Sequence, residues 1–294
     1  QKEVIKSQFA FRLYSKLNGL EDKYKAGIYD LDNTMDVREI AVLLQEGKGF
    51  AEIVKFTIPE GFEIRMIVDK LVEIGLGDKN RFYEAINNGM YKYDFLQNIW
   101  RNEERLEGYL FPDTYEVYKN TEEEKIIDKM LERFDNVFNE EYKKRVEEMD
   151  MSMDEIVTLA SIIEREAKVD EERKIISSVF HNRLKSKMML QSCATVQYVL
   201  KERKEILLYK DLEIQSPYNT YKNLGLPPGP IASPGLKSIE AALYPDNTDY
   251  LYFVAKDDGT HVFTRTFKEH IEAQNKLKNK AQNDGGYNDR QKQI

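Results

Sequence analysis

The sequence of 294 residues is poor in several features, and each shortage excludes a class of protein. It contains one cysteine, Cys193, so the chain can form no internal disulfide. Its three histidines are widely separated and no cysteine pair accompanies them, so we expect no metal site and no cofactor. No apolar run reaches the roughly 18 residues that a membrane-spanning helix needs. Nothing within this sequence is therefore expected to span a membrane.

Positive charge is also in short supply. The 44 lysines and arginines are outnumbered by 52 aspartates and glutamates, which gives a net charge of −8. This excess of acid argues against nucleic acid or an anionic membrane surface as the main partner. Apolar residues make up 41% of the chain, which is enough for a substantial core, and the length suffices for two domains.

Two short units of similar plan are predicted near the N-terminus. The first combines a strand at 25–31 with a helix that begins at Asp36, where Asp36 and Glu39 form a capping box. The second combines a strand, a glycine turn and a helix, over 54–58, 59–61 and 64–74. Both therefore have the order strand, turn and short helix.

The expected fold class is α+β. We assign residues 1–120 to an N-terminal region of two βα subunits that divide near residue 54. Residues 121–280 form a second domain, which opens with a charged amphipathic helical stretch over 121–149. The polar tail, 281–294, is expected to be disordered.

The stretch 159–167 holds a glutamate where a core residue is expected. Ser152 and Glu155 form a capping box that predicts a helix over 153–166. At helical spacing Glu166 continues the apolar stripe of that helix, whereas Glu164 lies on the other side. A carboxyl group that loses hydration against apolar neighbours suits the donation and recovery of a proton. Glu166 is therefore the candidate acid, and the chain turns directly after it, since a second helix begins near Asp170.

Proline is concentrated in one segment of the second domain. Five of the eight prolines fall between residues 217 and 234, which predicts a rigid irregular loop over 216–235. Long loops within compact domains are usually functional, so we expect this one to face Glu166. The domain then closes with a β-hairpin and a helix, over 250–255, 261–264 and 267–280.

The motifs of the second domain, taken together, resemble the endolytic murein transglycosylases, the YceG-like family. They are LASIIEREA at 159–167, VFHNRLKSKMMLQS at 179–192, TVQY at 195–198, SPYNTY at 216–221, GLPPGPIASPG at 225–235, DYLYFVA at 249–255 and HVF at 261–263. The segments KAGIY and EGYLFPDTY are similar to the same family. The two N-terminal units resemble LysM modules, which grip N-acetylated glycan chains in a shallow groove.

The resemblance implies N-terminal LysM-like βα units followed by a mixed α+β lytic transglycosylase domain. It implies cleavage within peptidoglycan strands, between N-acetylmuramic acid and N-acetylglucosamine, to leave 1,6-anhydro-muramyl ends without a cofactor. It further implies a bacterial single-pass membrane protein whose catalytic domain lies outside the cytoplasm, with wall-synthesis enzymes as possible partners. The resemblance therefore implies that a membrane anchor precedes Gln1, and the chain opens without an initiator methionine.

The resemblance also assigns the catalytic glutamate to Glu166, in agreement with the helix pattern. Candidates to hold the hydroxyl and N-acetyl groups of the sugars are Glu164, Asn182, Gln191, Ser192, Tyr218, Asn219, Thr220, Tyr221 and His261. Each has a structural alternative. The polar loop residues could brace the backbone, His261 could be a structural histidine, and Glu166 could pair with Arg165 or Arg173.

Two other functions stay open at this point. One is a lysozyme-type hydrolase, in which water is the nucleophile, and the other is a non-catalytic glycan-binding module that recruits wall-synthesis partners. The sequence also departs from the family at one place, because Cys193-Ala194 stands where many relatives have Asp-Pro. An acidic group can therefore have no role at that position in this chain.

Overall fold

The computed structural model describes residues 8–27, 29, 31, 34–47, 52–97, 99, 104–204 and 207–283, the side chains of 281–283 aside. The chain forms two compact units, one of residues 1–56 and 115–122 and the other of residues 57–114 and 123–294. None of the helices within this described part combines the length and apolar character that crossing a membrane would need.

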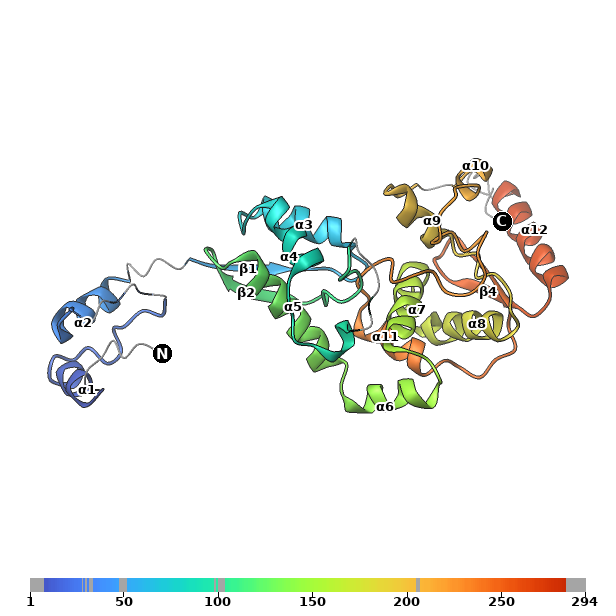
Figure 1. Cartoon of the computed structure of the whole chain (residues 1–294). Helices are drawn as coiled ribbons and strands as arrows, with labels where there is room; N and C mark the ends of the chain where they lie inside the picture. Colours follow the sequence, from blue (N-terminus) through green and yellow to red (C-terminus); the bar gives the residue numbers. More distant parts are fainter. Residues whose placement is uncertain are drawn as a thin grey trace. The chain divides into compact units, whose positions relative to one another are not determined.

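The first unit contains two helices that pack against each other, α1 (Gln8–Leu17) and α2 (Val37–Glu46) (Figure 1). The predicted capping box of α2 is confirmed, because the Asp36 side chain accepts from the Glu39 N–H at 2.8 Å and the Glu39 carboxylate accepts from the Asp36 N–H at 2.9 Å. The predicted strand at 25–31 includes residues 28 and 30, which lie outside the described residues. Residues 24–27, 29 and 31 belong to no helix or strand.

Two strands carry the chain from one unit to the other. β1 (Ile53–Thr57) pairs with β2 (Thr114–Tyr118), and the Lys119 N–H donates to the Glu52 carbonyl at 2.8 Å at one end of the pair. The strand predicted at 54–58 is thus confirmed with a shift of one residue. Cross-strand contacts between Phe56 and Tyr115, whose ring centroids are 5.6 Å apart, fix the register.

The second unit is mainly helical, with one small sheet. Before the buried helix α7 (Met153–Glu166) it contains α3 (Ile64–Glu73), α4 (Lys79–Asn88), η1 (Asp94–Leu96), α5 (Glu123–Val137) and α6 (Glu140–Glu148). After α7 come η2 (Asp170–Glu172), α8 (Arg173–Lys185), α9 (Cys193–Leu200), α10 (Tyr209–Leu212), α11 (Leu236–Leu243), β3 (Tyr252–Ala255), β4 (His261–Thr264) and α12 (Phe267–Asn283).

Helix α7 lies at the centre of this unit, against α8 and α11 (Figure 1). The predicted start and end of the helix are confirmed, as is the capping box in which the Ser152 Oγ accepts from the Glu155 N–H at 3.2 Å. Every residue from Ile156 to Ile163 is buried, which is more than one apolar stripe. The helix is enclosed because neighbouring elements cover it on several sides, and this makes it a rigid base for its last turn.

The other predicted elements agree with the structure apart from one break. The helical stretch 121–149 is divided into α5 and α6 at Asn139, whose side chain accepts from the Tyr142 N–H at 3.1 Å and so begins a new helix. The predicted hairpin is confirmed, since β3 pairs antiparallel with β4 and Phe253 lies opposite Phe263. Helix α12 ends at Asn283, and the rest of the predicted tail lies outside the described residues.

Gly108 illustrates how tightly the segment 107–111 packs within the second unit. It has a φ of 87°, and a Cβ there would lie 2.5 Å from the Pro230 Cβ and 3.0 Å from the Val157 Cγ1. We expect Gly108→Ala to lower the free energy of unfolding by about 2–3 kcal/mol, from the left-handed backbone and the overpacking together.

Urea denaturation of this variant and of Gly225→Ala measures the effect. Gly225 has a similar φ of 82°, but a Cβ added there would meet no atom within 4 Å, so its change should cost only about 1 kcal/mol. Equal losses in the two variants would contradict the packing argument.

Candidate active site

Glu166 is the last residue of α7, where the helix leaves the core. Ala167 takes an extended conformation with ψ 120°, and its N–H donates to the Ile163 carbonyl at 2.9 Å. Residues 164–166 are half-buried, whereas Ile163 is fully buried. Glu166 is therefore less buried than its place on the apolar stripe predicted, because the enclosed part of the helix ends one turn earlier. Its carboxylate is accessible from one side and fixed on the other.

Ser192 fixes the Glu166 carboxylate. Its Oγ donates to the Glu166 Oε1 at 2.5 Å. Ser192 itself is buried, and its N–H donates to the Thr220 Oγ1 at 3.0 Å. The Thr195 Oγ1 bonds both the Ser192 carbonyl, at 2.8 Å, and the Thr220 Oγ1, at 2.9 Å. The hydroxyl that holds Glu166 is thus positioned by two buried threonines.

The predicted residues Gln191 and Thr220 belong to the same arrangement. The Gln191 N–H donates to the Thr220 carbonyl at 3.1 Å, and Gln191 has a left-handed φ of 51°. This conformation turns the chain sharply before α9 and leaves the Gln191 side chain exposed. The Arg183 Nη1 reaches the Gln191 Oε1 at 3.4 Å. The structure therefore brings Gln191, Ser192 and Thr220 together next to Glu166.

Tyr221 and Cys193 form a second contact beside Glu166. The Cys193 Sγ and the Tyr221 hydroxyl are 3.1 Å apart. Burial, and then the nearby Glu166 charge, raise the pKa of the Cys193 thiol to about 11, although the hydrogen bond with Tyr221 opposes this. Burial also raises the pKa of Tyr221. Both groups are neutral near pH 7. Cys193 therefore puts an uncharged thiol at the first position of α9, where the resemblance led us to expect an aspartate.

Cys193 gives a spectroscopic test of this geometry, because it is the only cysteine. With a pKa of about 11, little thiolate exists near neutral pH, so reaction with a disulfide reagent should be slow and should accelerate as the pH rises toward 11. In Glu166→Gln the thiol should react faster at every pH below 11, since a nearby negative charge is gone. An unchanged rate would contradict the proximity of Glu166. Denatured protein supplies the reference rate.

Glu164 points away from Glu166. Its side chain is 7% exposed, and its carboxylate accepts from the Arg173 Nη1 at 3.3 Å and from the Gly235 N–H at 3.0 Å. Arg173 also donates to the Asp170 Oδ1 at 3.0 Å and to the Ser238 Oγ at 2.6 Å. The structure therefore shows Glu164 joining α7 to the proline-rich loop and α8.

The later part of the proline-rich loop packs on the Glu164 side of α7. The Ile231 N–H donates to the Ser161 Oγ at 3.0 Å, and the Ser233 carbonyl accepts from the Gly61 N–H at 2.9 Å. Residues 231–235 contact Ser161, Glu164 and the turn 59–63, whereas Thr220 and Tyr221, in the first part of the same loop, bind Ser192 and Cys193 beside Glu166. The expectation that the loop faces Glu166 therefore holds for its first part and is wrong for residues 231–235. Residues 229–235 are all buried, and this packing holds the turn in place.

Tyr218 packs against Tyr198, which is in turn bound to two glutamates. The rings of Tyr218 and Tyr198 have centroids 5.1 Å apart, and the Tyr198 hydroxyl donates to Glu104 at 3.1 Å and to Glu107 at 3.5 Å. Glu107 is 1% exposed and accepts from the Ile64 N–H at the start of α3. Burial raises the pKa of Glu107 well above its usual range. Tyr218 is thus half-buried against a rigid support.

Three predicted residues have structural contacts elsewhere. The Asn182 amide donates to the carbonyls of Thr248 and Tyr250, both at 2.9 Å. Asn219 is fully buried, and its amide donates to the carbonyls of Leu212, the last residue of α10, and Ile214. His261 is buried, and its Nδ1 lies 2.6 Å from the Glu172 Oε2. These bonds favour the structural alternative for all three, and a substrate contact stays a prediction.

Two arginines near Glu166 were not predicted as site residues. Arg165 and Arg203 both donate to the Gly61 carbonyl, at 3.2 Å each. Arg165 could have been noticed from its place between the two glutamates. Arg203 carries no comparable signal, because a lone arginine in a polar segment is usually solvated.

Within the described residues no group of three or more metal-binding side chains occurs.

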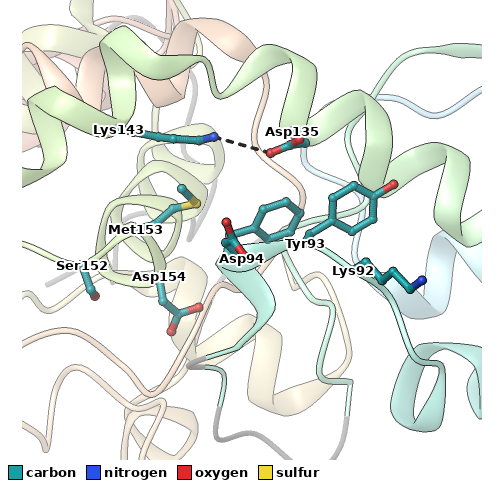
Figure 2. A pocket seen from close by; sticks show the side chains of 9 residues that line it. Lys92, Tyr93, Asp94, Asp135, Lys143, Ser152, Met153 and Asp154 are labelled. Atoms are coloured by element: carbon teal, nitrogen blue, oxygen red, sulfur yellow. Dashed lines mark ion pairs between the residues drawn. The ribbon is translucent and has the colours of Figure 1, made fainter.

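A cavity lies at the other end of α7. It measures about 730 Å³ and is lined by residues that include Tyr93, Asp94 and Met153 (Figure 2). Figure 2 also shows the ion pair of Lys143 and Asp135, at 3.8 Å, on its edge. Since α7 has 14 residues, this cavity is about 20 Å from Glu166 along the helix. It is therefore separate from the candidate site.

Sequence comparison finds relatives over almost the whole chain. Residues 1–276 match the profile of the YceG-like family. An endolytic murein transglycosylase of Bacillus subtilis is 41% identical over 288 residues, which cover 94% of this chain and 79% of that protein. An endolytic murein transglycosylase of Streptococcus pneumoniae is 34% identical over 86% of this chain, and the chain spans 50% of its length.

Structural comparison agrees with this result. A crystal structure of a YceG-like protein from Listeria monocytogenes is 38% identical and superimposes with a TM-score of 0.67, over 92% of this chain and 91% of that one. The α+β class predicted from the sequence is confirmed. So is the resemblance drawn from the motifs, and the chain belongs to the YceG-like family.

Proposed function

We propose that this chain is an endolytic lytic transglycosylase. It cleaves the bond between N-acetylmuramic acid and N-acetylglucosamine within peptidoglycan strands and leaves 1,6-anhydro-muramyl ends. The observation that carries this is Glu166, half-buried at the end of α7 with one carboxylate oxygen fixed by Ser192. Relatives named endolytic murein transglycosylases, at 41% and 34% identity, support the same reaction.

Glu166 serves first as an acid and then as a base. When protonated it donates its proton to the glycosidic oxygen, and the bond from that oxygen to C1 of the muramyl sugar breaks. The C6 hydroxyl of the same sugar then bonds to C1, and the Glu166 carboxylate takes the proton that this hydroxyl releases. Two product ends form, no water is consumed, and Glu166 is protonated again for the next cycle.

A single carboxyl group suffices for this route. Other glycosidases need two carboxylates, which lie about 6.5–9.5 Å apart where water attacks directly and about 5–5.5 Å apart where a covalent intermediate forms. Glu164 is unsuited as the second, because Arg173 and the Gly235 N–H already occupy its two oxygens. Here the sugar supplies its own nucleophile. Ser192 keeps the carboxylate in one rotamer, so that the same oxygen can serve both steps.

Two other side chains are proposed to contact the sugars, and two more to shape the site. The exposed Gln191 amide and the half-buried ring of Tyr218 suit N-acetyl groups and sugar faces. The Thr220 and Tyr221 hydroxyls belong to the network that positions Ser192 and Cys193, so their contribution is to shape the site. Glu164, Asn182, Asn219 and His261 are proposed to act on the substrate only through the elements that they hold in place.

The N-terminal part is proposed to bind glycan. The order of β1, α3, α4 and β2, with the two strands paired, supports a LysM-like module. The division into a binding region before residue 121 and a catalytic domain after it stays a prediction. We further propose a bacterial protein of the cell membrane that faces the wall and works beside wall-synthesis enzymes.

Mass spectrometry of the products distinguishes this proposal from its alternatives. Purified peptidoglycan digested by the protein should yield internal fragments that end in anhydro-muramyl groups. Reducing muramyl ends instead would favour a lysozyme-type hydrolase. No new ends, together with retained binding to the strands, would favour a glycan-binding module.

A further inference from the structure

Arg165 and Arg203 come together on one oxygen atom although both are cations. Arg165 belongs to the last turn of α7, and Arg203 follows α9 by three residues. Each donates one hydrogen bond of 3.2 Å to the Gly61 carbonyl, so the two donor nitrogens are no more than twice that distance apart. A guanidinium group is always charged, and two such groups at this separation repel each other.

Among the described residues, no carboxylate is bound directly to either arginine of this pair. Within the described residues neither arginine forms an ion pair, although other arginines nearby do. Glu63 is buried and bound to Arg65 at 2.6 Å, and the Glu166 carboxylate is bound to Ser192. Burial, and then the charge of Arg203, lower the pKa of Arg165, although the charges of Glu63 and Glu166 act in the opposite direction.

The backbone of the turn 59–63 accounts for this arrangement. Gly61 has a left-handed φ of 72°, and its N–H is bound by the Ser233 carbonyl, so the Gly61 carbonyl points toward the arginines. Each guanidinium has five N–H donors, and the bond to Gly61 occupies one of them. The same Nη2 of Arg203 also lies 3.8 Å from the Met66 Sδ. Both groups therefore keep donors in the planar, paired geometry that matches a carboxylate.

We propose that Arg165 and Arg203 form a binding site for a carboxylate on the side branch of the muramyl sugar. The inference rests on the proposed function, since the residue after Arg165 is Glu166, which acts at that sugar. In intact strands the branch carries a peptide stem with free carboxylates, and after loss of the stem the lactyl group itself ends in one. Binding of this branch would orient the scissile bond against Glu166 and make the enzyme prefer one state of the strand.

The test compares three preparations of the same peptidoglycan strands. In the first the stems carry free carboxylates, in the second these are chemically amidated, and in the third an amidase has removed the stems. The value of kcat/KM for release of anhydro ends is measured with the wild type, Arg203→Gln, Arg203→Lys and Arg265→Gln. Arg265 is the matched control, because it is an exposed arginine paired with Asp249 and outside this site.

For a stem carboxylate, the wild type should prefer the free over the amidated strands by about ten- to a hundredfold, as expected for a charged hydrogen bond. Arg203→Gln should reduce this preference to within about threefold, Arg203→Lys should keep part of it, and Arg265→Gln all of it. If the lactyl carboxylate is the ligand, Arg203→Gln instead loses activity selectively on the strands without stems.

A loss of equal size on all three preparations, or a preference that Arg203→Gln leaves intact, would overturn the inference. Neither result affects the proposed function, because wild-type activity is present in both. That function fails separately, if the wild type releases anhydro ends from none of the preparations. Arg165→Gln provides a second variant, which should change the preference in the same direction as Arg203→Gln.

Discussion

Replacement of Glu166 by glutamine should lower the rate of strand cleavage by roughly 10²- to 10⁴-fold, the usual contribution of general acid–base catalysis. Glutamine cannot donate the proton that the leaving oxygen needs, nor recover it from the muramyl hydroxyl. It can still accept the hydrogen bond from Ser192, so the site should keep its shape. Release of anhydro ends over time, measured by chromatography, gives the ratio of the two rates.

The control for this variant is Glu171→Gln, which removes a carboxylate from an exposed position five residues away. Its rate should match that of the wild type. Thermal unfolding of both variants should differ little from the wild type, because Glu166 is only half-buried. An active Glu166→Gln protein, or loss of activity in both variants, would contradict the assignment.

Replacement of Arg173 by alanine should lower the free energy of unfolding by about 3–5 kcal/mol. The side chains of Arg173 and Glu164 are 10% and 7% exposed, so the change leaves a buried carboxylate without its cation. It also removes the bonds of Arg173 to Asp170 and Ser238. Thermal denaturation should shift by roughly 2–4 °C for each kcal/mol.

The matched control is Arg265→Ala. Arg265 and its partner Asp249 are 58% and 70% exposed at a distance of 2.6 Å, and such pairs contribute about 1 kcal/mol or less. If both variants lost a similar free energy of unfolding, the buried Arg173–Glu164 pair would contribute no more to stability than the exposed Arg265–Asp249 pair. The proline-rich loop would then need another anchor than Glu164.

Local patterns in the sequence were enough to predict the elements that build the site. The Ser152–Glu155 capping box gave the start of α7, and the restart near Asp170 gave its end, so the position of Glu166 at a helix terminus was predictable. Capping and amphipathic spacing are properties of a few neighbouring residues, which is why they can be recognised in one chain. The break at Asn139 was missed, because its helix-breaking cap lies within a continuous amphipathic pattern.

The contacts that complete the site depend on residues distant in the sequence. Ser192 is 26 residues from Glu166, and Arg203 is 142 residues from Gly61. The proline content predicted a rigid loop but not its partner, since rigidity does not determine which face of α7 the loop covers. The left-handed turn at Gly61 joins that loop to the arginines, and no local pattern in the chain indicates this contact.

The central claim is that one carboxyl group, Glu166, cleaves the strand while the sugar supplies its own nucleophile. Digestion in water enriched in ¹⁸O, followed by mass spectrometry of the new muramyl ends, tests it most directly. We predict anhydro ends that contain no ¹⁸O in the wild type, and almost no new ends in Glu166→Gln. Muramyl ends that carry one ¹⁸O from the solvent would show that water is the nucleophile and would contradict the account.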